Sequence, residues 1–550
     1  MRDRARLWAW LLAAGLAWLV VYPLLLVMVD GLREPGGWTL QHVDRFVSRP
    51  GEWQALWASL WLSLASVVLS AAVGVPLAFL FERVDFPGRA FLGVLVALPA
   101  VLPPLVGVIA FLFLYGETGF TARFVQWLLR LDEPPWRLAG PGAILLVHAY
   151  SMYVYFFLFC RAGLARLDGS MLEAAQALGA GRWRTLWSVV LPHLRPALAG
   201  ASLLTFMTSL ASFSAPYIFG GGYKVMTTQI VFTRLNGDDR LAMVETAALS
   251  LLALGALWVF RRADPGGALA AVGKGTAPAL ARVGSLGTRR AIAALAWVLA
   301  GILLLPHLTL LVVSFVPSGT WTTEPIPPAY SLANYLALFQ EPERFRPLAN
   351  SLWMATLATG VAAAVALGAA ILVVRRRVPT GRLIEALIGL PWAVPGTVFA
   401  IALAALFSVH DPLRLRFVLV GTLWILPLAY LVRILPITGR AIFAGFRHLD
   451  PSLEEAAASL GADRRRTLRR VVLPALRPAL AAGATLAFVT ALGDFVTSIM
   501  LYTYETRPIS LEILASLRQG DVGVAAANGV FLMLASAVVF ALGARREARG

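Results

Sequence analysis

The chain of 550 residues contains one cysteine, Cys160, and its only lysines are Lys224 and Lys274. A single cysteine excludes a disulfide framework and any metal cluster built from several thiolates. The six histidines show no paired spacing, so the sequence predicts no metal site. Charged residues make up 14% of the chain and hydrophobic residues 59%, which is far more apolar than an average soluble domain.

An ATP-binding loop is also missing. A P-loop needs Gly, four residues, and then Gly-Lys-Ser or Gly-Lys-Thr, so that backbone amides wrap the phosphate oxygens. The nearest stretch, Gly267 to Gly273-Lys274, has five intervening residues and continues with Gly275. No convincing Ser-His-Asp or Cys-His grouping is visible. We therefore expect a chain that is not an enzyme and that binds no cofactor of its own.

What the chain has instead is a series of long apolar runs. Most reach the roughly 20 residues needed to cross about 30 Å of hydrocarbon, and the ten-residue alternation of barrel strands is absent. We predict an all-α polytopic membrane protein with about twelve transmembrane helices, six in each half. The runs are 7–29, 57–81, 91–115, 143–160, 197–219, 241–260, 291–316, 352–374, 384–407, 417–435, 479–502 and 522–542.

The net charge of +17 is spread unevenly along the chain. With the N-terminus in the cytoplasm, most basic residues fall on the cytoplasmic side, which is the asymmetry typical of inner-membrane proteins that face anionic lipid. The charge therefore indicates contact with membrane lipid and not with nucleic acid. We expect a multi-pass protein of the bacterial inner membrane with both termini in the cytoplasm.

One segment of the chain occurs twice. Residues 167–198 and 449–480 are 282 positions apart and are identical at 22 of 32 positions. Such a repeat indicates a duplication, and six spans in each half make the copies parallel repeats. We expect a first six-helix repeat at 1–262, a Gly-, Ala- and Arg-rich cytoplasmic linker at 263–288, and a second six-helix repeat at 289–550.

The repeated segment carries signals for two short helices. Ser170 and Ser452 each precede a glutamate by three residues, so both predict a capping box. Gly179 and Gly461 are suited to the left-handed geometry that ends a helix. We expect two short helices joined at a glycine elbow on the cytoplasmic face. One such loop is equally compatible with a simple linker between spans, but two near-copies favour a docking element.

The pattern Glu-Ala-Ala, three residues, Gly, nine residues, an aliphatic residue, one residue, Leu-Pro resembles the EAA signature of permeases of binding-protein-dependent ABC importers. The signature residues are Glu173, Ala174, Ala175 and Gly179, and then Glu455, Ala456, Ala457 and Gly461. The resemblance implies the type I ABC importer permease fold, in which these loops are the coupling helices. It also implies a cytoplasmic ABC ATPase dimer that binds ATP and Mg, and a periplasmic or lipid-anchored solute-binding protein.

Within that family, one chain with two halves resembles the fused permeases of the iron(III) and thiamine branch. The stretches 212–217 with 220–223, and 493–496 with 507–510, look most like permeases assigned to iron(III). The resemblance therefore implies import of iron(III). Import of 2-aminoethylphosphonate, thiamine or polyamine by the same machinery is the alternative.

Polar residues inside the apolar runs are candidates for the translocation pathway. Asp494 falls in the eleventh run, where an unpaired carboxylate costs at least a few kcal/mol, and its counterpart in the first half is Ser212. Glu245 lies near the outer end of the sixth run and falls opposite Ala527, one residue before Asn528. Either carboxylate is a candidate for lining a cation pathway. The alternative role is a structural hydrogen bond to a neighbouring helix.

Two other classes of protein stay open at this point. A secondary transporter of twelve spans needs coupling-ion sites near the membrane midplane, and it leaves the duplicated loop unexplained. A membrane-embedded enzyme needs a cluster of intramembrane catalytic groups, and the sequence shows none.

Overall fold

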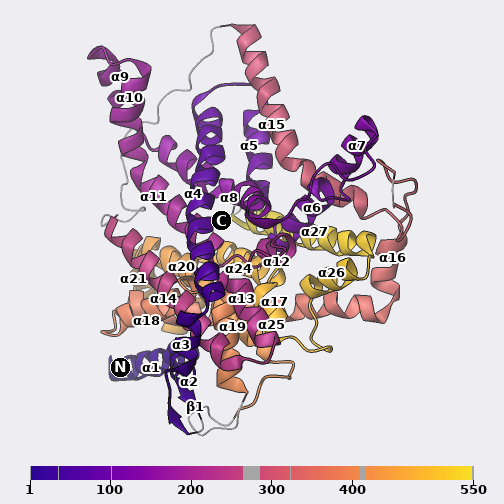
Figure 1. Ribbon diagram of the computed structural model, residues 1–550. Helices are drawn as coiled ribbons and strands as arrows, with labels where there is room; N and C mark the ends of the chain where they lie inside the picture. The colour runs from indigo at the N-terminus through magenta and orange to yellow at the C-terminus, as the bar shows by residue number, and fades with distance from the viewer. Residues whose placement is uncertain are drawn as a thin grey trace.

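The computed structural model describes residues 2–34, 36–100, 102–263, 285–321, 324–408 and 417–547 (Figure 1). The first half contains α1 (Arg2–Leu16), η1 (Ala17–Val21), α2 (Tyr22–Asp30), the hairpin of β1 (Arg33–Glu34) and β2 (Gly37–Trp38), α3 (Gln41–Ser48), α4 (Pro50–Arg83), α5 (Arg89–Ala97), η2 (Leu98–Ala100), α6 (Pro104–Tyr115), α7 (Phe120–Leu129), α8 (Gly140–Ala165), α9 (Gly169–Ala177), α10 (Arg182–Thr185), η3 (Leu186–Val190), α11 (Leu191–Leu210), α12 (Ser214–Phe219), α13 (Met226–Leu235) and α14 (Asp239–Ala263).

The second half consists of helices and connecting loops in the part that the structure describes. It contains α15 (Leu286–Val313), α16 (Ala333–Gln340), α17 (Pro342–Ala370), η4 (Ile371–Arg375), α18 (Gly381–Gly389), η5 (Leu390–Trp392), α19 (Gly396–Phe407), α20 (Ile425–His448), α21 (Ser452–Ser459), α22 (Arg464–Thr467), η7 (Leu468–Val472), α23 (Leu473–Ala475), α24 (Arg477–Leu492), α25 (Val496–Leu501), α26 (Ile509–Arg518) and α27 (Val522–Glu547).

The duplication seen in the sequence is repeated in the helices. α10, η3 and α12 have counterparts of equal length in α22, η7 and α25, and each pair is separated by the same spacing as the two copies of the loop. α6 and α19 also have equal lengths. The two halves therefore fold in the same chain order and direction, as expected of parallel repeats. The linker was expected at 263–288, and most of it, residues 264–284, lies outside the described residues.

The described chain has ten helices that are long and apolar enough to cross a membrane, or up to twelve if each of two bent pairs counts as one span. The prediction of about twelve transmembrane helices is therefore confirmed. The bent pairs are Gly381–Trp392 with Gly396–Phe407, at 109°, and Arg464–Ala475 with Arg477–Leu492, at 65°. The expected runs 197–219 and 479–502 are also interrupted, because α11 ends at Leu210 and α24 ends at Leu492, ahead of two short helices.

The two repeats exchange their first spans. α1 packs against α18 and α2 against α19, whereas α15 of the second half packs against α5 and α6 of the first (Figure 1). Trp18 meets Phe407 edge-to-face at 5.7 Å, and Tyr150 donates a hydrogen bond of 2.8 Å to the carbonyl of Leu303. Each half is thus completed by a helix of the other, and the division into two sequence repeats does not correspond to two separate bodies.

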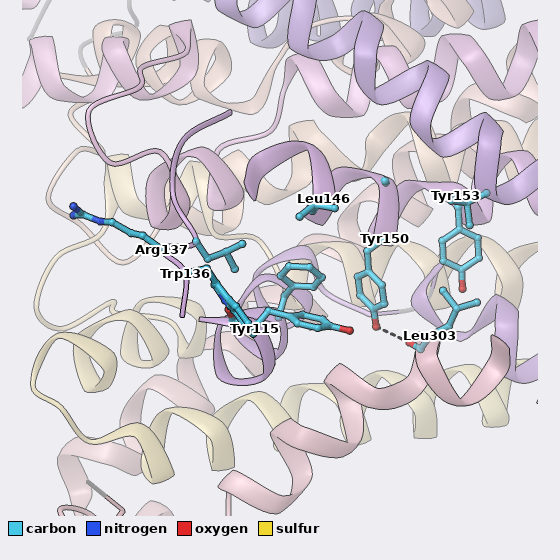
Figure 2. Close-up of a pocket in the computed structure, with 11 residues that line it drawn as sticks. Tyr115, Trp136, Arg137, Leu146, Tyr150, Tyr153 and Leu303 are labelled. Carbon is cyan, nitrogen blue, oxygen red and sulfur yellow. Dashed lines mark hydrogen bonds between the residues drawn. The ribbon is translucent and has the colours of Figure 1, made fainter. Parts of the chain in front are cut away.

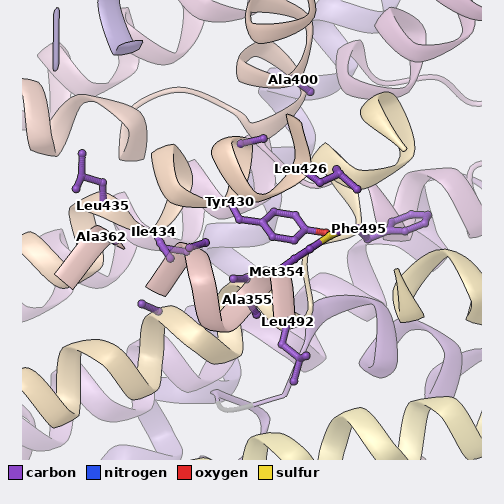
Figure 3. Close-up of a cluster of buried hydrophobic side chains, with 14 of the residues drawn as sticks. Met354, Ala355, Ala362, Ala400, Leu426, Tyr430, Ile434, Leu435, Leu492 and Phe495 are labelled. Carbon is purple, nitrogen blue, oxygen red and sulfur yellow. The ribbon is translucent and has the colours of Figure 1, made fainter. Parts of the chain in front are cut away.

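A buried cluster in the second half packs around Tyr430 of α20 (Figure 3). Met354 and Ala355 of α17 and Leu492 at the end of α24 are buried in the same cluster. The Tyr430 hydroxyl lies 2.6 Å from Oγ of Ser498, which satisfies its polar tip inside the apolar surroundings. This cluster fixes α20 against the break between α24 and α25, where the charged residues described below are found.

Candidate translocation cavity and coupling loops

Both copies of the repeated loop form two short helices joined at a glycine. Gly179 has φ = 75° and Gly461 has φ = 79°, so both take the left-handed conformation. An added Cβ would meet nothing within 4 Å at either position. The glycines are therefore needed for the backbone conformation and not for close packing. The expected elbow is present in both halves.

The expected capping boxes are not formed. In α9 the side chain of Asp168 accepts the first-turn N–H of Ser170 at 3.0 Å, and in the second copy Asp450 accepts the N–H of Ser452 at 2.9 Å. Hydrogen bonds from Ser452 also hold the pKa of Asp450 below its ordinary value. The capping-box prediction is wrong because an aspartate two residues ahead of each serine takes the cap, which leaves Glu173 exposed.

A wide helical turn follows each elbow. η3 and η7 are π-helical, and the N–H of Leu191 and of Leu473 each bonds to the carbonyl five residues earlier. Pro192 and Pro474 come next, and a proline ring would clash with the carbonyl four residues before it in a regular α-helix. The extra residue in the turn makes room for the ring. The same proline therefore sets how the loop joins the next span in both halves.

The tip of each loop carries an exposed leucine that the sequence analysis did not single out. Leu178 is 87% exposed and Leu460 is 89% exposed, each one residue before its elbow glycine. No residue of α9 is buried, and in α21 only Ala457 is. A single exposed apolar side chain is ordinary on a protein surface, but a leucine at the same exposed place in both copies of the repeat favours a surface that a partner covers. The signal was available, because both leucines occupy the same place in the repeat.

The two loops are attached to the body differently. In the second half, Glu454 of α21 forms an ion pair with Arg375 at 2.7 Å. In the first half the matching position is Leu172, which packs into an apolar cluster with Leu164 and Leu194. α10 to α11 form one continuous span, whereas the matching helix bends by 65°. α9 and α10 accordingly project as an arm at the upper left of Figure 1, and α21 lies lower, beside α20.

A cavity of about 330 Å³ lies between the two halves. Its first-half lining comes from α6, α8, α11 and α12, and its second-half lining from the break before α19, from α20 and from the ends of α24 and α25. Ser212, one of the pathway residues predicted from the sequence, lines this cavity. Asp494 does not appear in the lining, but Arg433, which contacts it, does.

Asp494 lies in the break between α24 and α25, not inside a continuous span. One carboxylate oxygen accepts the N–H of Thr497 at 2.9 Å, so Asp494 caps α25, and the other is 3.3 Å from Nε of Arg433. The side chain of Asp494 is 5% exposed and that of Arg433 is 27% exposed. The guanidinium of Arg433 is therefore nearer to the cavity than the carboxylate of Asp494 is. Sequence reasoning missed Arg433, although an arginine within an apolar run is itself a signal.

In the first half the matching break is uncharged. His148 of α8 is buried, and its Nε2 lies 2.9 Å from Oγ of Ser212. Its Nδ1 lies 2.9 Å from Oγ of Ser66 and 3.1 Å from Oγ of Ser209. A histidine with three hydroxyl partners fixes the position of Ser212. One side of the cavity thus carries an ion pair, and the other carries a neutral hydrogen-bonded network.

The other two pathway candidates lie elsewhere. Glu245 is fully buried in α14 and accepts a hydrogen bond of 2.7 Å from Thr233. Asn528 is buried in α27 and donates to the carbonyl of Val524 at 3.1 Å. Neither residue lines the cavity between the halves. Glu245 has the kind of structural hydrogen bond to a neighbouring helix that was the alternative to a pathway role.

A larger cavity of about 520 Å³ lies between the first half and α15 (Figure 2). Tyr115, Trp136, Tyr150 and Leu303 are among its lining residues, and the Tyr150 hydroxyl points at the Leu303 carbonyl (Figure 2). The lining also includes Leu146, which is 55% exposed on a candidate membrane span. This cavity therefore opens towards the surface that lipid would cover. Its lining comes from one half plus a single residue of the exchanged helix, so it is a poorer candidate for a pathway.

The comparisons with known proteins agree with the duplicated architecture. Residues 71–266 and 356–549 each match the family described as "binding-protein-dependent transport system inner membrane component". The chain belongs to this family. It is a multi-pass membrane protein made of two such permease repeats, and the match accounts for the duplicated loop that a secondary transporter leaves unexplained.

Three relatives illustrate the range of similar permeases. A probable ABC transporter permease protein of Sinorhizobium fredii is 30% identical over 98% of this chain and 95% of its own length. A ferric transport system permease protein of Actinobacillus pleuropneumoniae is 28% identical over 94% of this chain and 74% of its own. A molybdenum transport system permease protein of Escherichia coli is 31% identical over 38% of this chain and 94% of its own.

Among solved structures, a bacterial ABC transporter involved in the import of the acidic polysaccharide alginate matches with 18% identity and a TM-score of 0.38, covering 53% of this chain and 98% of its own.

The described residues contain no group of three or more His, Cys, Asp or Glu side chains that could hold a metal ion. The chain is an ABC importer permease, a transport component whose family works in general with an ATPase and a solute-binding protein.

Proposed function

We propose that this chain forms the translocation pathway of an ATP-driven importer for iron(III) and couples to two cytoplasmic ATPase subunits through its two EAA loops. The observation that carries the coupling role is the pair of exposed elbows with Leu178 and Leu460 at their tips. The same exposed leucine occurs at the tip of each of the two repeated loops. Two copies of one ATPase subunit could each bury one of these leucines in the same groove. The iron assignment is supported by the ferric permease relative, which is similar over 94% of this chain.

In this proposal the chain itself binds no cofactor, and ATP with Mg is bound by the partner ATPase. The loops lie in the cytoplasm, together with both termini, and the hairpin of β1 and β2 lies on the opposite side, where a periplasmic or lipid-anchored binding protein delivers the solute. Closure of the ATPase dimer moves the two loops together. Coupling then requires that the ATPase bind the inward-facing and outward-facing states with different affinity.

The cavity between the halves is where such a movement would act. It is lined by both repeats, so a change in their relative position changes its shape and its openings. The helix breaks that border this cavity allow the helices before and after each break to move independently. Iron(III) is the proposed solute, and 2-aminoethylphosphonate, thiamine and polyamine are the alternatives for the same machinery.

The experiment is uptake of radioactive iron(III) by cells that lack other iron importers and express this chain with its ATPase and binding protein. The matched control carries Gly179→Val and Gly461→Val, which disturb the elbows at residues that do not line the cavity. We expect uptake with the native chain and none with the control. If the ATPase co-purifies with the native chain but no iron enters, the coupling proposal survives and the iron assignment is wrong. If no ATPase co-purifies, the coupling proposal is wrong.

A further inference from the structure

The charges that face the cavity between the halves have one sign. Within the described part of the chain, Arg433 is the only Arg, Lys, Asp or Glu residue that lines this cavity. Hydroxyl groups of Ser151, Thr208 and Ser212 line it as well. Hydroxyls can turn to donate or accept, so they favour neither sign of charge. The fixed charge met by a solute inside the cavity is therefore that of a guanidinium.

The carboxylate partner of Arg433 does not cancel this charge at the cavity surface. Asp494 accepts hydrogen bonds from the N–H groups of Thr497 and Ser498, at 2.9 and 3.3 Å, and its side chain is far less exposed than that of Arg433. A solute that touches the guanidinium is closer to the positive charge than to the negative one. Because Coulomb energy falls with distance, an anion gains more from the arginine than it loses to the aspartate.

A second positive element lies against the guanidinium. The helix α19 begins at Gly396, which lines the cavity, and no side chain caps its first turn. A Cβ at Gly396 would overlap Nη1 of Arg433, so guanidinium and helix N-terminus are in direct contact. A helix N-terminus stabilises an anion and opposes a cation.

Placing these two positive elements together is unfavourable unless negative charge balances them. Asp494 supplies part of that balance from behind the guanidinium. A helix N-terminus beside a guanidinium forms a donor set that binds oxyanions, because each offers hydrogen to oxygen lone pairs. A cavity of about 330 Å³ is large enough for a small oxyanion or a chelated metal ion.

We propose that the solute crosses this cavity carrying anionic oxygen atoms, either as a free oxyanion or as a ferric ion enclosed by carboxylate or phosphate ligands. Arg433 and the N-terminus of α19 bind those oxygens. This inference rests on the cavity being the pathway of the proposed importer. It names the chemical form of the solute, and it excludes a bare cation as the species that passes.

The test uses the full chain in lipid nanodiscs, and the measurement is its thermal unfolding midpoint in the presence of each probe. Molybdate and inorganic phosphate are the free oxyanions, ferric citrate is the chelated ion, and spermidine and hexaamminecobalt(III) are the cations. A ligand that binds the folded state raises the midpoint. We expect at least one oxyanion or the ferric chelate to raise it and neither cation to do so. Stabilisation by a cation alone, or by no anionic probe, would overturn the inference.

The variants separate a binding role of Arg433 from a structural one. Arg433→Gln with Asp494→Asn removes both charges and leaves no buried ion unpaired, so it is expected to fold. The matched control is Arg440→Gln, which removes an exposed arginine of the same helix that stacks on Trp392 at 4.6 Å. We expect the double variant to lose the anion-dependent shift and the control to keep it. Retention of the shift by the double variant would assign Arg433 to structure only.

Transport by cells distinguishes a free oxyanion from a chelated ferric ion. It also tests this inference separately from the iron assignment. Loss of one charge-assisted hydrogen bond lowers binding by about tenfold or more, so the double variant should take up the true solute at least about tenfold more slowly while still co-purifying with its ATPase. Uptake of molybdate or phosphate without iron would refute the iron assignment and keep the inference. Iron uptake at the native rate by the double variant would refute the inference and keep the assignment.

Discussion

Nε of Arg375 lies 2.7 Å from a carboxylate oxygen of Glu454, so the end of the long α17–η4 helix is tied to α21, the first helix of the repeated loop in its own half. The guanidinium of Arg375 also donates to the carbonyl of Leu449, at 3.1 Å, at the first residue of the repeated segment. In the first half an apolar contact through Leu172 takes the place of this ion pair. The second loop is thus held by an ion pair, which salt can weaken. The first loop is held by an apolar contact, which salt does not screen.

This difference predicts that the two loops respond unequally to mutation. Glu454→Gln should loosen the second loop and lower ATP hydrolysis by the complex by a few-fold, since a partly buried ion pair near the surface is worth about 1 kcal/mol. The matched change Leu172→Gln should act on the first loop alone. Cysteines placed at Leu178 or Leu460 report on each tip separately, because the native Cys160 is buried. Equal changes in labelling at both tips in the Glu454→Gln variant would contradict the prediction.

The elbow glycines give a prediction with an internal control. Gly179→Val and Gly461→Val each force a β-branched residue into a left-handed conformation, at a cost of about 1–2 kcal/mol. The chain should still insert in the membrane but fail to bind its ATPase, as measured by co-purification. Asparagine tolerates this conformation, and the Cβ meets no neighbour. Gly179→Asn and Gly461→Asn should therefore bind the ATPase. Normal binding by the valine variants would show that the elbow does not dock a partner.

The exposed leucines predict a loss of affinity without a loss of fold. Leu178→Ser and Leu460→Ser remove apolar surface that is almost fully exposed in this chain, so its stability should change little. If a partner buries each tip, the pair of changes costs about 2–3 kcal/mol per leucine on binding. ATPase co-purification should fall sharply. Exposed Leu129, on α7, provides the control Leu129→Ser, which should leave co-purification unchanged.

The contact between Gly396 and Arg433 predicts a position that tolerates no side chain. Gly396→Ala places a methyl group where Nη1 lies, so the guanidinium must move and its contact with α19 is lost. Uptake should fall while ATPase binding persists. Gly389→Ala is the control at the end of α18, where an added Cβ meets nothing within 4 Å. Similar uptake by both alanine variants would mean that the position of Arg433 is unimportant for transport.

The ion pair predicts the sign of a charge change. Asp494→Asn retains a side chain that can cap α25, so the protein should insert normally and keep its ATPase. The variant leaves the guanidinium without its counter-charge, which strengthens its attraction for an anion. We expect uptake of an anionic solute to be kept or raised. A pathway for bare cations would instead lose most of its uptake, so the two solute types are separated by one rate measurement.

The sequence was sufficient for the architecture because its signals are strong and local. Apolar runs of membrane-spanning length, a segment repeated at one fixed offset, and a glycine in each elbow predicted the spans, the repeat and the two loops. The capping prediction was wrong because Asp168 and Asp450 compete with the glutamates for the same first-turn N–H groups, and spacing alone does not decide such a competition. The helix breaks at 211–213 and 493–495 were likewise hidden inside runs of apolar residues.

The interior of the site depended on contacts between distant residues. Asp494 was recognisable as an intramembrane carboxylate, but its partner Arg433 lies on another helix, and the whole second copy of the repeated loop separates the two along the chain. Nothing local in the sequence says that Arg433 faces the cavity and Asp494 does not. The same holds for His148, whose three hydroxyl neighbours come from α4, from the last turn of α11 and from the break that follows it. Charge at a site can be read from sequence, but which member of an ion pair meets the solute requires the packing.

The exchange of first spans has a consequence for how the protein is made. α1 buries Ala9 and Ala13 in a cluster whose other members come largely from the second half, including Ile384 of α18. Chains emerge from the ribosome N-terminus first, so α1 enters the membrane before its packing partner exists. During synthesis its small-residue face meets lipid, and the first six spans await α15 in turn. The two exchanged contacts therefore form at different times: α15 can pack on α5 and α6 as soon as it is synthesised, whereas α1 reaches its final packing only after α18 has been synthesised.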